Sequence, residues 1–156
     1  MKRLLIIVLA VIMLVGCSAS RTAITVEEFI AKAEAAGYSV RDRMDEDHPD
    51  EALYYYDATK ATGGPETIEF RQITFMIFTT DEYSKSVFKN QKTEYEKNKA
   101  EEYSIEEKTN DKFEYYYLTS DGKFSVVSRV ENTIIFAWAD EEFKTETSDF
   151  LKTIGY

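Results

Sequence analysis

The strongest constraint on the fold is a strand-and-turn pattern in the last third of the chain. Residues 113–118 and 123–130 are rich in apolar and aromatic side chains, and Thr119-Ser120-Asp121-Gly122 separates them. An Asp-Gly pair between two such runs is a strong signal for a tight β-hairpin turn. A second short turn at Glu131-Asn132 leads into residues 133–138. The pattern predicts a three-strand antiparallel meander.

Helical signals lie on both sides of this meander and earlier in the chain. Thr25 and Glu28 form a T-x-x-E capping box ahead of an apolar repeat at helical spacing, and Gly37 is a natural stop. A second helix is expected over residues 81–98. Asp140 is expected to cap a third helix, whose apolar residues Phe143, Phe150, Leu151 and Ile154 would face the core.

The remaining segments predict further strands and loops. Residues 53–58 read as a strand, and residues 68–78 read as a central strand that is apolar on both faces, with a bulge at Arg71-Gln72. The polar residues 42–51 and the densely charged residues 92–112 are expected to be solvated loops or helix ends. Helices that alternate with groups of antiparallel strands predict an α+β, two-layer domain with about three helices.

The chain begins with a segment that is typical of protein export. Lys2 and Arg3 precede an unbroken apolar run over residues 4–15, which is twelve residues long. A helix of this length spans about 18 Å, well short of the ~30 Å hydrocarbon core of a bilayer. A positive start, a short apolar run and small residues after it indicate a signal peptide rather than a membrane-spanning helix.

The end of this apolar run resembles the lipobox of bacterial lipoproteins. The matching residues are Leu14-Val15-Gly16-Cys17, and Cys17 is the only cysteine in the chain. The resemblance implies cleavage before Cys17 and attachment of a diacylglycerol to its thiol, usually with acylation of the new amino terminus. We therefore expect a signal peptide over residues 1–16, a lipidated tether over 17–23 and one domain over 24–156. Two or more acyl chains form a stable anchor.

The charge of the chain restricts its partners. The formal net charge is −10, and removal of residues 1–16 takes away only Lys2 and Arg3, which leaves −12. Nucleic-acid binding requires a basic surface, so nucleic acid is not expected as a partner. Anionic headgroups would repel so acidic a body, so the lipid on Cys17 is expected to hold the protein at the extracytoplasmic face of the cell membrane.

The sequence offers few residues for catalysis or metal binding. His48 is the single histidine and is expected to be solvated, and no phosphate-binding loop or serine elbow is present. With this His and one Cys, a zinc site is not expected. Residues 45–51 cluster acidic side chains, but they lack the spacing of a calcium loop. We therefore predict no metal and no cofactor.

Two tyrosine triplets are the remaining candidates for a functional surface. In a strand the middle residue of each triplet faces away from its neighbours, so one side could build the core while the other meets solvent. Leu53 and Phe113 favour burial of the positions that share their phase. Tyr54, Tyr56 and Tyr116 are then the predicted interaction surface. The alternative is that both triplets reflect only β-sheet propensity and cross-strand pairing.

The expected function is a non-catalytic binding or interaction domain on a lipid anchor. The alternative is a carrier or sensor with an aromatic-lined pocket for a small apolar or sugar-like ligand. An enzyme that uses carboxylates alone is a third reading, because no spacing singles out a pair among the 29 acidic residues. A deep pocket would favour the carrier, and an exposed tyrosine patch would favour the interaction domain.

Overall fold

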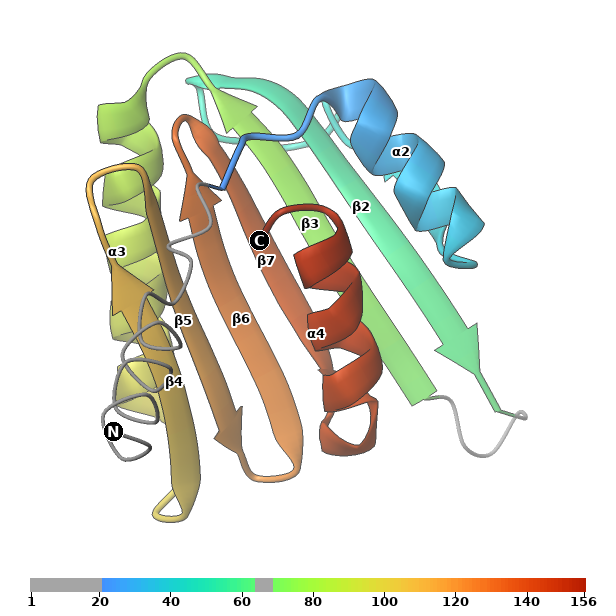
Figure 1. Ribbon diagram of the computed structural model, residues 1–156, viewed down its shortest axis with the longest axis vertical. Helices are drawn as coiled ribbons and strands as arrows, with labels where there is room; N and C mark the ends of the chain where they lie inside the picture. Colours follow the sequence, from blue (N-terminus) through green and yellow to red (C-terminus); the bar gives the residue numbers. More distant parts are fainter. Residues whose placement is uncertain (1–20, 64–68) are drawn as a thin grey trace, which may run out of the picture.

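The computed structural model describes residues 21–63 and 69–156 as a seven-stranded antiparallel sheet with helices on both faces (Figure 1). The elements are α2 (Val26–Ala35), β1 (Ser39–Asp42), β2 (Ala52–Thr62), β3 (Glu69–Phe78), α3 (Asp81–Asn98), β4 (Tyr103–Thr109), β5 (Phe113–Ser120), β6 (Lys123–Val130), β7 (Thr133–Asp140), a 3-10 turn (Glu141–Phe143) and α4 (Lys144–Thr153).

The strands follow the order β1-β2-β3-β7-β6-β5-β4. Every neighbouring pair is antiparallel, and β3 pairs with β7 in the middle of the sheet. Helix α3 carries the chain from the central strand β3 to the edge strand β4. The three strands that follow return by successive hairpins, as the Asp-Gly turn predicts, so the meander β5-β6-β7 is confirmed.

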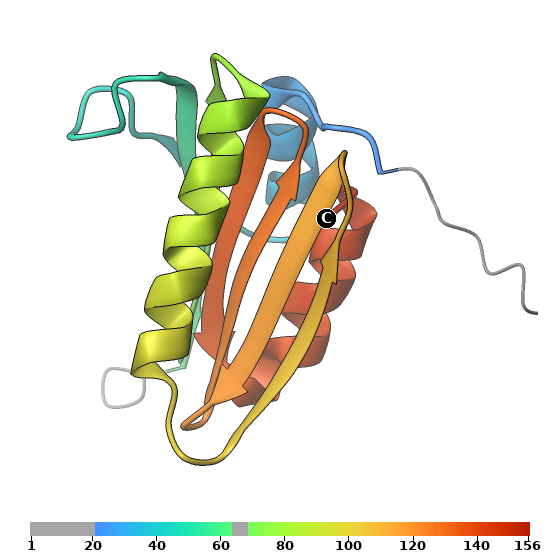
Figure 2. The ribbon, with the colours of Figure 1, turned by 90° about the vertical axis from the view of Figure 1, so that its left-hand side faces the viewer.

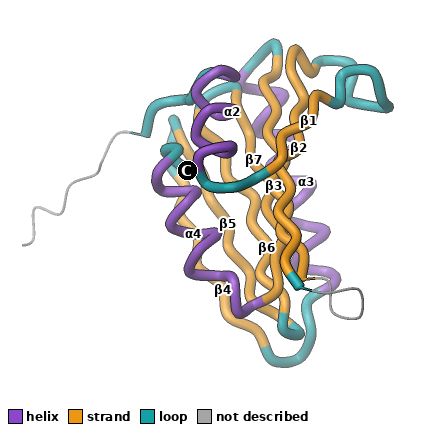
Figure 3. Tube along the Cα trace, turned by 90° about the vertical axis from the view of Figure 1, so that its right-hand side faces the viewer, coloured by secondary structure: helices purple, strands orange, loops and turns teal. Residues whose placement is uncertain are grey.

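The helices form two layers around the sheet. Helices α2 and α4 cover one face and α3 covers the other, as the two side views show (Figures 2 and 3). The α+β class and the mainly antiparallel sheet with three helices are confirmed, but the domain has three layers rather than the expected two. Several strands are apolar on both faces, and burial of both faces requires a helix layer on each side of the sheet.

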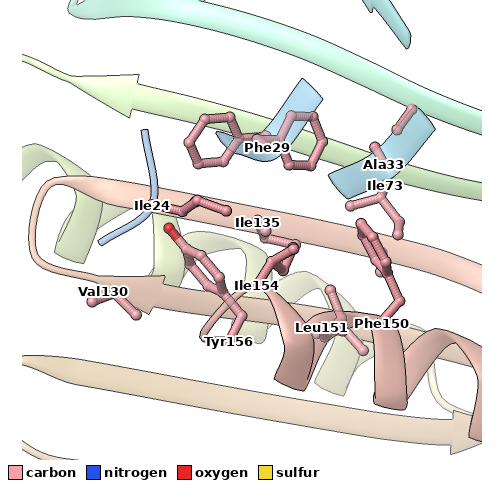
Figure 4. Packing of buried hydrophobic residues seen from close by; sticks show 14 of the residues in the cluster. Ile24, Phe29, Ala33, Ile73, Val130, Ile135, Phe150, Leu151, Ile154 and Tyr156 are labelled. Carbon is pink, nitrogen blue, oxygen red and sulfur yellow. The ribbon is translucent and has the colours of Figure 1, made fainter. Parts of the chain in front are cut away.

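The larger core cluster lies between the sheet and the α2/α4 layer (Figure 4). Phe29 of α2 stacks on Phe75 of β3 with ring centroids 4.7 Å apart. Helix α4 and the residues after it contribute Phe150, Leu151, Ile154 and Tyr156. A second cluster lies under α3 and contains Ala52, Met76, Phe78, Phe88, Tyr116, Leu118, Val127 and Ile134.

The predicted ends of α2 are confirmed by their hydrogen bonds. The backbone N–H of Glu28 donates to Thr25 Oγ1 and the N–H of Thr25 donates to Glu28 Oε2, each at 3.2 Å. Gly37 adopts φ +84°. Its N–H and that of Tyr38 donate to the carbonyls of Glu34 and Ala33, which is the hydrogen-bond pattern of a Schellman stop.

Several local features differ from the expectations. Strand β4 falls within residues 92–112, where a solvated loop was expected, and all of its side chains are exposed. The bulge lies in β2 between Ala52 and Tyr54, whereas β3 keeps a regular register at Arg71-Gln72. Asp140 does not cap the final helical segment with its side chain, because its carboxylate pairs with Lys123.

Candidate functional site

The first tyrosine triplet is partly exposed beside the bulge in β2. The side chains of Leu53 and Tyr54 are 49% and 45% exposed. Tyr56 is half-buried against the core on the α2/α4 side. Tyr55 lies on the opposite face, against the α3-side cluster and beneath the Arg43 guanidinium. Tyr54 is therefore the exposed tyrosine of this triplet, and Tyr56 shares its face of the strand but is partly covered by the core. Leu53 was expected to favour burial but is exposed, because the bulge displaces it from the regular register.

The second tyrosine triplet is largely buried, and the prediction of an exposed Tyr116 is wrong. Tyr116 is fully buried under α3, in the same cluster as Leu118 and Val127. Tyr117 lies on the other face of β5 and is also buried. Burial raises the pKa of Tyr117 to about 12. The three predicted residues do not form one surface, because Tyr54 and Tyr56 lie four strands away from Tyr116 in the sheet.

The burial of Tyr116 follows from the position of α3. This helix covers the face of the sheet that would meet solvent in the predicted two-layer fold. It contributes Phe88 and the half-buried Tyr83, Val87 and Tyr95 to the cluster. A sequence signal for this was present, since Leu118 shares the phase of Tyr116 just as Phe113 shares that of Tyr117. Both faces of β5 were therefore apolar.

The first residue of the described chain contacts β5 on its α2/α4 side. The Arg21 guanidinium carbon lies 5.0 Å from the centre of the Phe113 ring and 4.8 Å from that of Tyr115. Such stacking combines a cation–π attraction with apolar contact. Arg21 belongs to the predicted tether, residues 17–23, and no pattern in the sequence indicates its contact with β5.

Packing of the next residues continues this attachment. Ile24 is buried in the core. The carbonyl oxygen of Thr22 would lie 3.2 Å from a Cβ atom at Gly155, which has φ +91°. A residue without a side chain therefore lets the start and the end of the domain approach closely.

A groove lies beside this attachment, between residues 21–24, α2 and residues 152–156. We call it the tether groove, and its volume is about 540 Å³. Arg21, Lys32 and Lys152 line it together with a single acidic side chain, Glu28. Glu28 is engaged in the capping box, and Lys32 Nζ donates to the carbonyl of Thr153 at 3.1 Å. The groove is thus a locally basic feature of an acidic protein.

The comparisons identify no relative. No protein-family model, curated protein or solved structure matches this chain.

Three ion-pair networks hold the domain together and were not anticipated from the sequence. Arg129, fully buried in β6, pairs with Glu114 at 2.8 Å. Arg71, 2% exposed, pairs with Glu146 of α4 at 2.6 Å. The carboxylate of Asp57 accepts hydrogen bonds from Arg43, Gln72 and Thr74. The first pair joins β6 to β5, the second joins β3 to α4, and Asp57 connects β2 to β3 and to the loop after β1, so all three networks link neighbouring parts of the fold.

The acidic loop shows no preformed cation site. Within residues 21–63 and 69–156, His, Cys, Asp and Glu side chains form no group of three or more that could hold a metal ion. Glu46 pairs with both Arg41 and Arg43 rather than with its acidic neighbours. His48 is half-buried rather than solvated, and its Nδ1 lies 3.0 Å from the Pro49 carbonyl oxygen.

A hollow between α4 and the strands β4 and β5 tests the idea of a carrier. Its volume is about 320 Å³, and its lining includes Tyr117, Ile105, Glu106 and Lys144. Tyr117 is the one aromatic residue in this lining, and most of the others are polar. Sites for small apolar ligands are mainly apolar and aromatic, so this hollow gives little support to a carrier.

Two further observations concern the membrane. Among the residues that the structure describes, no helix is long and apolar enough to cross a bilayer. Cys17 and the apolar run at residues 4–15 lie outside the described residues.

Proposed function

We propose that this chain is an exported lipoprotein, held at the extracytoplasmic face of the cell membrane by lipid on Cys17. Its α+β domain acts there as a non-catalytic interaction domain. The single observation that carries the anchor is the sequence Leu14-Val15-Gly16-Cys17 directly after a short apolar run with a positive start. Acylation also accounts for a lone cysteine in an exported protein.

The interaction surface in this proposal is the β2 bulge surface, which comprises Leu53, Tyr54 and Tyr56. Leu53 and Tyr54 are two of the large apolar side chains with substantial exposure. Exposed aromatic residues with few rotatable bonds lose little entropy on binding, and they are enriched where proteins bind one another. Tyr116 has no part in this surface, because it is buried.

The anchor is tested by replacing the acylated residue. Cys17→Ala should abolish incorporation of labelled palmitate and move the protein from the membrane fraction to soluble or uncleaved forms, since the lipid is the proposed attachment. The measurement is cell fractionation with metabolic labelling. A Cys17→Ala variant that is retained and labelled like the parent would exclude the lipoprotein.

The interaction surface is tested with two tyrosines of similar exposure. Tyr54→Ala removes an aromatic side chain that is 45% exposed beside the bulge, and Tyr103→Ala removes one that is 50% exposed on the edge strand β4. Cross-linking in intact cells should recover a partner with the parent and with Tyr103→Ala, and markedly less of it with Tyr54→Ala. Equal recovery with both variants would remove the β2 bulge surface from the proposal.

A further inference from the structure

We propose that the tether groove faces the bilayer and that Arg21, Lys32 and Lys152 contact the phosphates of anionic lipid headgroups. The inference rests on the proposed lipid anchor at Cys17 and adds to it a defined orientation of the domain. In this orientation the α2/α4 layer lies toward the membrane and α3 lies away from it.

The length of chain between the anchor and the domain supports this orientation. Only residues 18–20 separate Cys17 from Arg21. Four peptide steps span about 14 Å at full extension, so the acylated residue must stay close to Arg21. Arg21 is in turn held on the rings of Phe113 and Tyr115, and Ile24 is buried. A short connection to a fixed point on the domain limits which surface can approach the lipid.

The direction of this connection is visible in the side views. The segment that begins at Arg21 leaves the domain on the side of α2 and α4, at the right of Figure 2 and the left of Figure 3. A bilayer reached through this segment therefore lies on the α2/α4 side, where the tether groove is formed.

The charges that line the tether groove favour the same orientation. Among the described residues, no carboxylate lies within ion-pair distance of Arg21 or Lys32, while Lys152 makes an exposed pair with Asp149. The acidic loop that precedes β2 projects on the opposite side, with α3, in both side views. Helices α2 and α4 together carry more acidic than basic residues, so the favourable charge is confined to the groove, where three cations face the single carboxylate of Glu28. Contact of these three cations with headgroup phosphates offsets part of the repulsion between anionic lipid and the mature chain, whose net charge is −12.

The test measures which face of the acylated protein approaches the lipid. Cys17 is the only cysteine, so after acylation an introduced cysteine is the single free thiol for a fluorescent label. Thr153→Cys places the label on α4 at the groove, and Asn90→Cys places it on the outer side of α3. Both positions are exposed and helical. The purified acylated proteins are reconstituted in vesicles that contain phosphatidylglycerol and a headgroup-attached quencher.

We expect quenching at residue 153 to exceed that at residue 90 several-fold. Lys32→Glu/Lys152→Glu in the Thr153→Cys background should reduce this difference, and so should vesicles of phosphatidylcholine alone. Equal quenching at both positions, or stronger quenching at residue 90, would overturn the orientation. A difference that neither the charge reversal nor the neutral lipid changes would overturn the headgroup contact. If the parent protein itself carried no palmitate and did not associate with the membrane, that result would instead refute the proposed function.

Discussion

Single residues in this domain show how burial of a polar side chain depends on its partners. Arg71 is almost fully buried, and its guanidinium donates to Glu146 at 2.6 Å and to Thr62 at 2.6 Å while it stacks on Phe143. Tyr116 is also buried, but its hydroxyl has no hydrogen-bond partner among the described residues. Removal of a hydrogen-bond partner of Arg71 should therefore destabilise the protein. Removal of the Tyr116 hydroxyl should not.

Truncation of Tyr116 should be strongly destabilising. Tyr116→Ala leaves a cavity between β5 and α3 and should lower the free energy of unfolding by about 3–5 kcal/mol. Tyr116→Phe should be neutral or slightly stabilising, since it removes a buried hydroxyl without a partner. Urea denaturation measures both, with the exposed Tyr103→Ala as the control. A Tyr116→Ala variant as stable as the control would contradict the burial of this ring.

Stability in acid should depend on Glu146. Hydrogen bonding from Lys60, and then the charge of Arg71, lower the pKa of Glu146 below its ordinary value, although burial opposes the shift. A lowered pKa means that the ionised pair stabilises the fold above the unfolded-state pKa of about 4.3, and that this contribution is lost as the pH falls through the folded-state pKa. Below these values the pair contributes no stability.

Glu146→Gln should therefore destabilise the domain at pH 7 and flatten the decline of stability below about pH 4.3. Urea denaturation across pH 3 to 7 measures this change. Asp149→Asn is the matched control, because Asp149 makes an exposed pair with Lys152 on the same helix. An unchanged slope in Glu146→Gln would show that Glu146 does not contribute to acid sensitivity.

At the scale of elements, backbone pairing forms a strand that the side-chain pattern does not predict. Strand β4 has exposed side chains throughout, yet its backbone pairs with β5 from Tyr103 to Thr109. Its charged residues suit an edge strand, because they discourage pairing with other chains. In β2, by contrast, the bulge places an apolar side chain, Leu53, in solvent.

The acidic loop before β2 should not respond selectively to calcium. Glu46 is paired with two arginines, and the carboxylate of Asp42 accepts from the N–H of Met44, so these groups are already engaged. Calcium should therefore raise the melting temperature of the protein no more than magnesium does. A calcium-selective rise that is lost in Asp45→Asn/Asp47→Asn would establish a metal site instead.

At the scale of the whole molecule, the sheet depends on cover for both faces. The chain from Lys144 to Tyr156 completes the α2/α4 layer and buries Phe150, Leu151, Ile154 and Tyr156. Loss of one large core side chain costs about 2–5 kcal/mol, whereas domains of this kind have a total stability of about 5–15 kcal/mol. Several such losses together exceed what the domain can tolerate.

A chain that ends before Lys144 should therefore not fold. Circular dichroism and limited proteolysis should show loss of cooperative unfolding and rapid digestion. Lys152→Ala in the full chain, which removes only an exposed ion pair, should behave like the parent. A truncated chain that unfolds cooperatively would show that the α3 side of the sheet forms a sufficient core alone.

The sequence by itself determined the features that depend on neighbours along the chain. The capping box at Thr25, the stop at Gly37, the helix over residues 81–98 and the hairpins around Asp121-Gly122 and Glu131-Asn132 all form as predicted. Their hydrogen bonds and dihedral preferences involve residues a few positions apart, so local patterns report them directly.

Tertiary structure alone decided which faces meet solvent. Tyr54 and Tyr116 have similar local sequences, but the bulge beside Tyr54 leaves it exposed, while α3 covers Tyr116. The position of Arg21 also depends on tertiary structure, because its contact with Phe113 and Tyr115 joins residues about 90 positions apart in the chain. The alternation of side chains within a strand shows which of its faces are apolar, but it does not identify the distant element that covers each face.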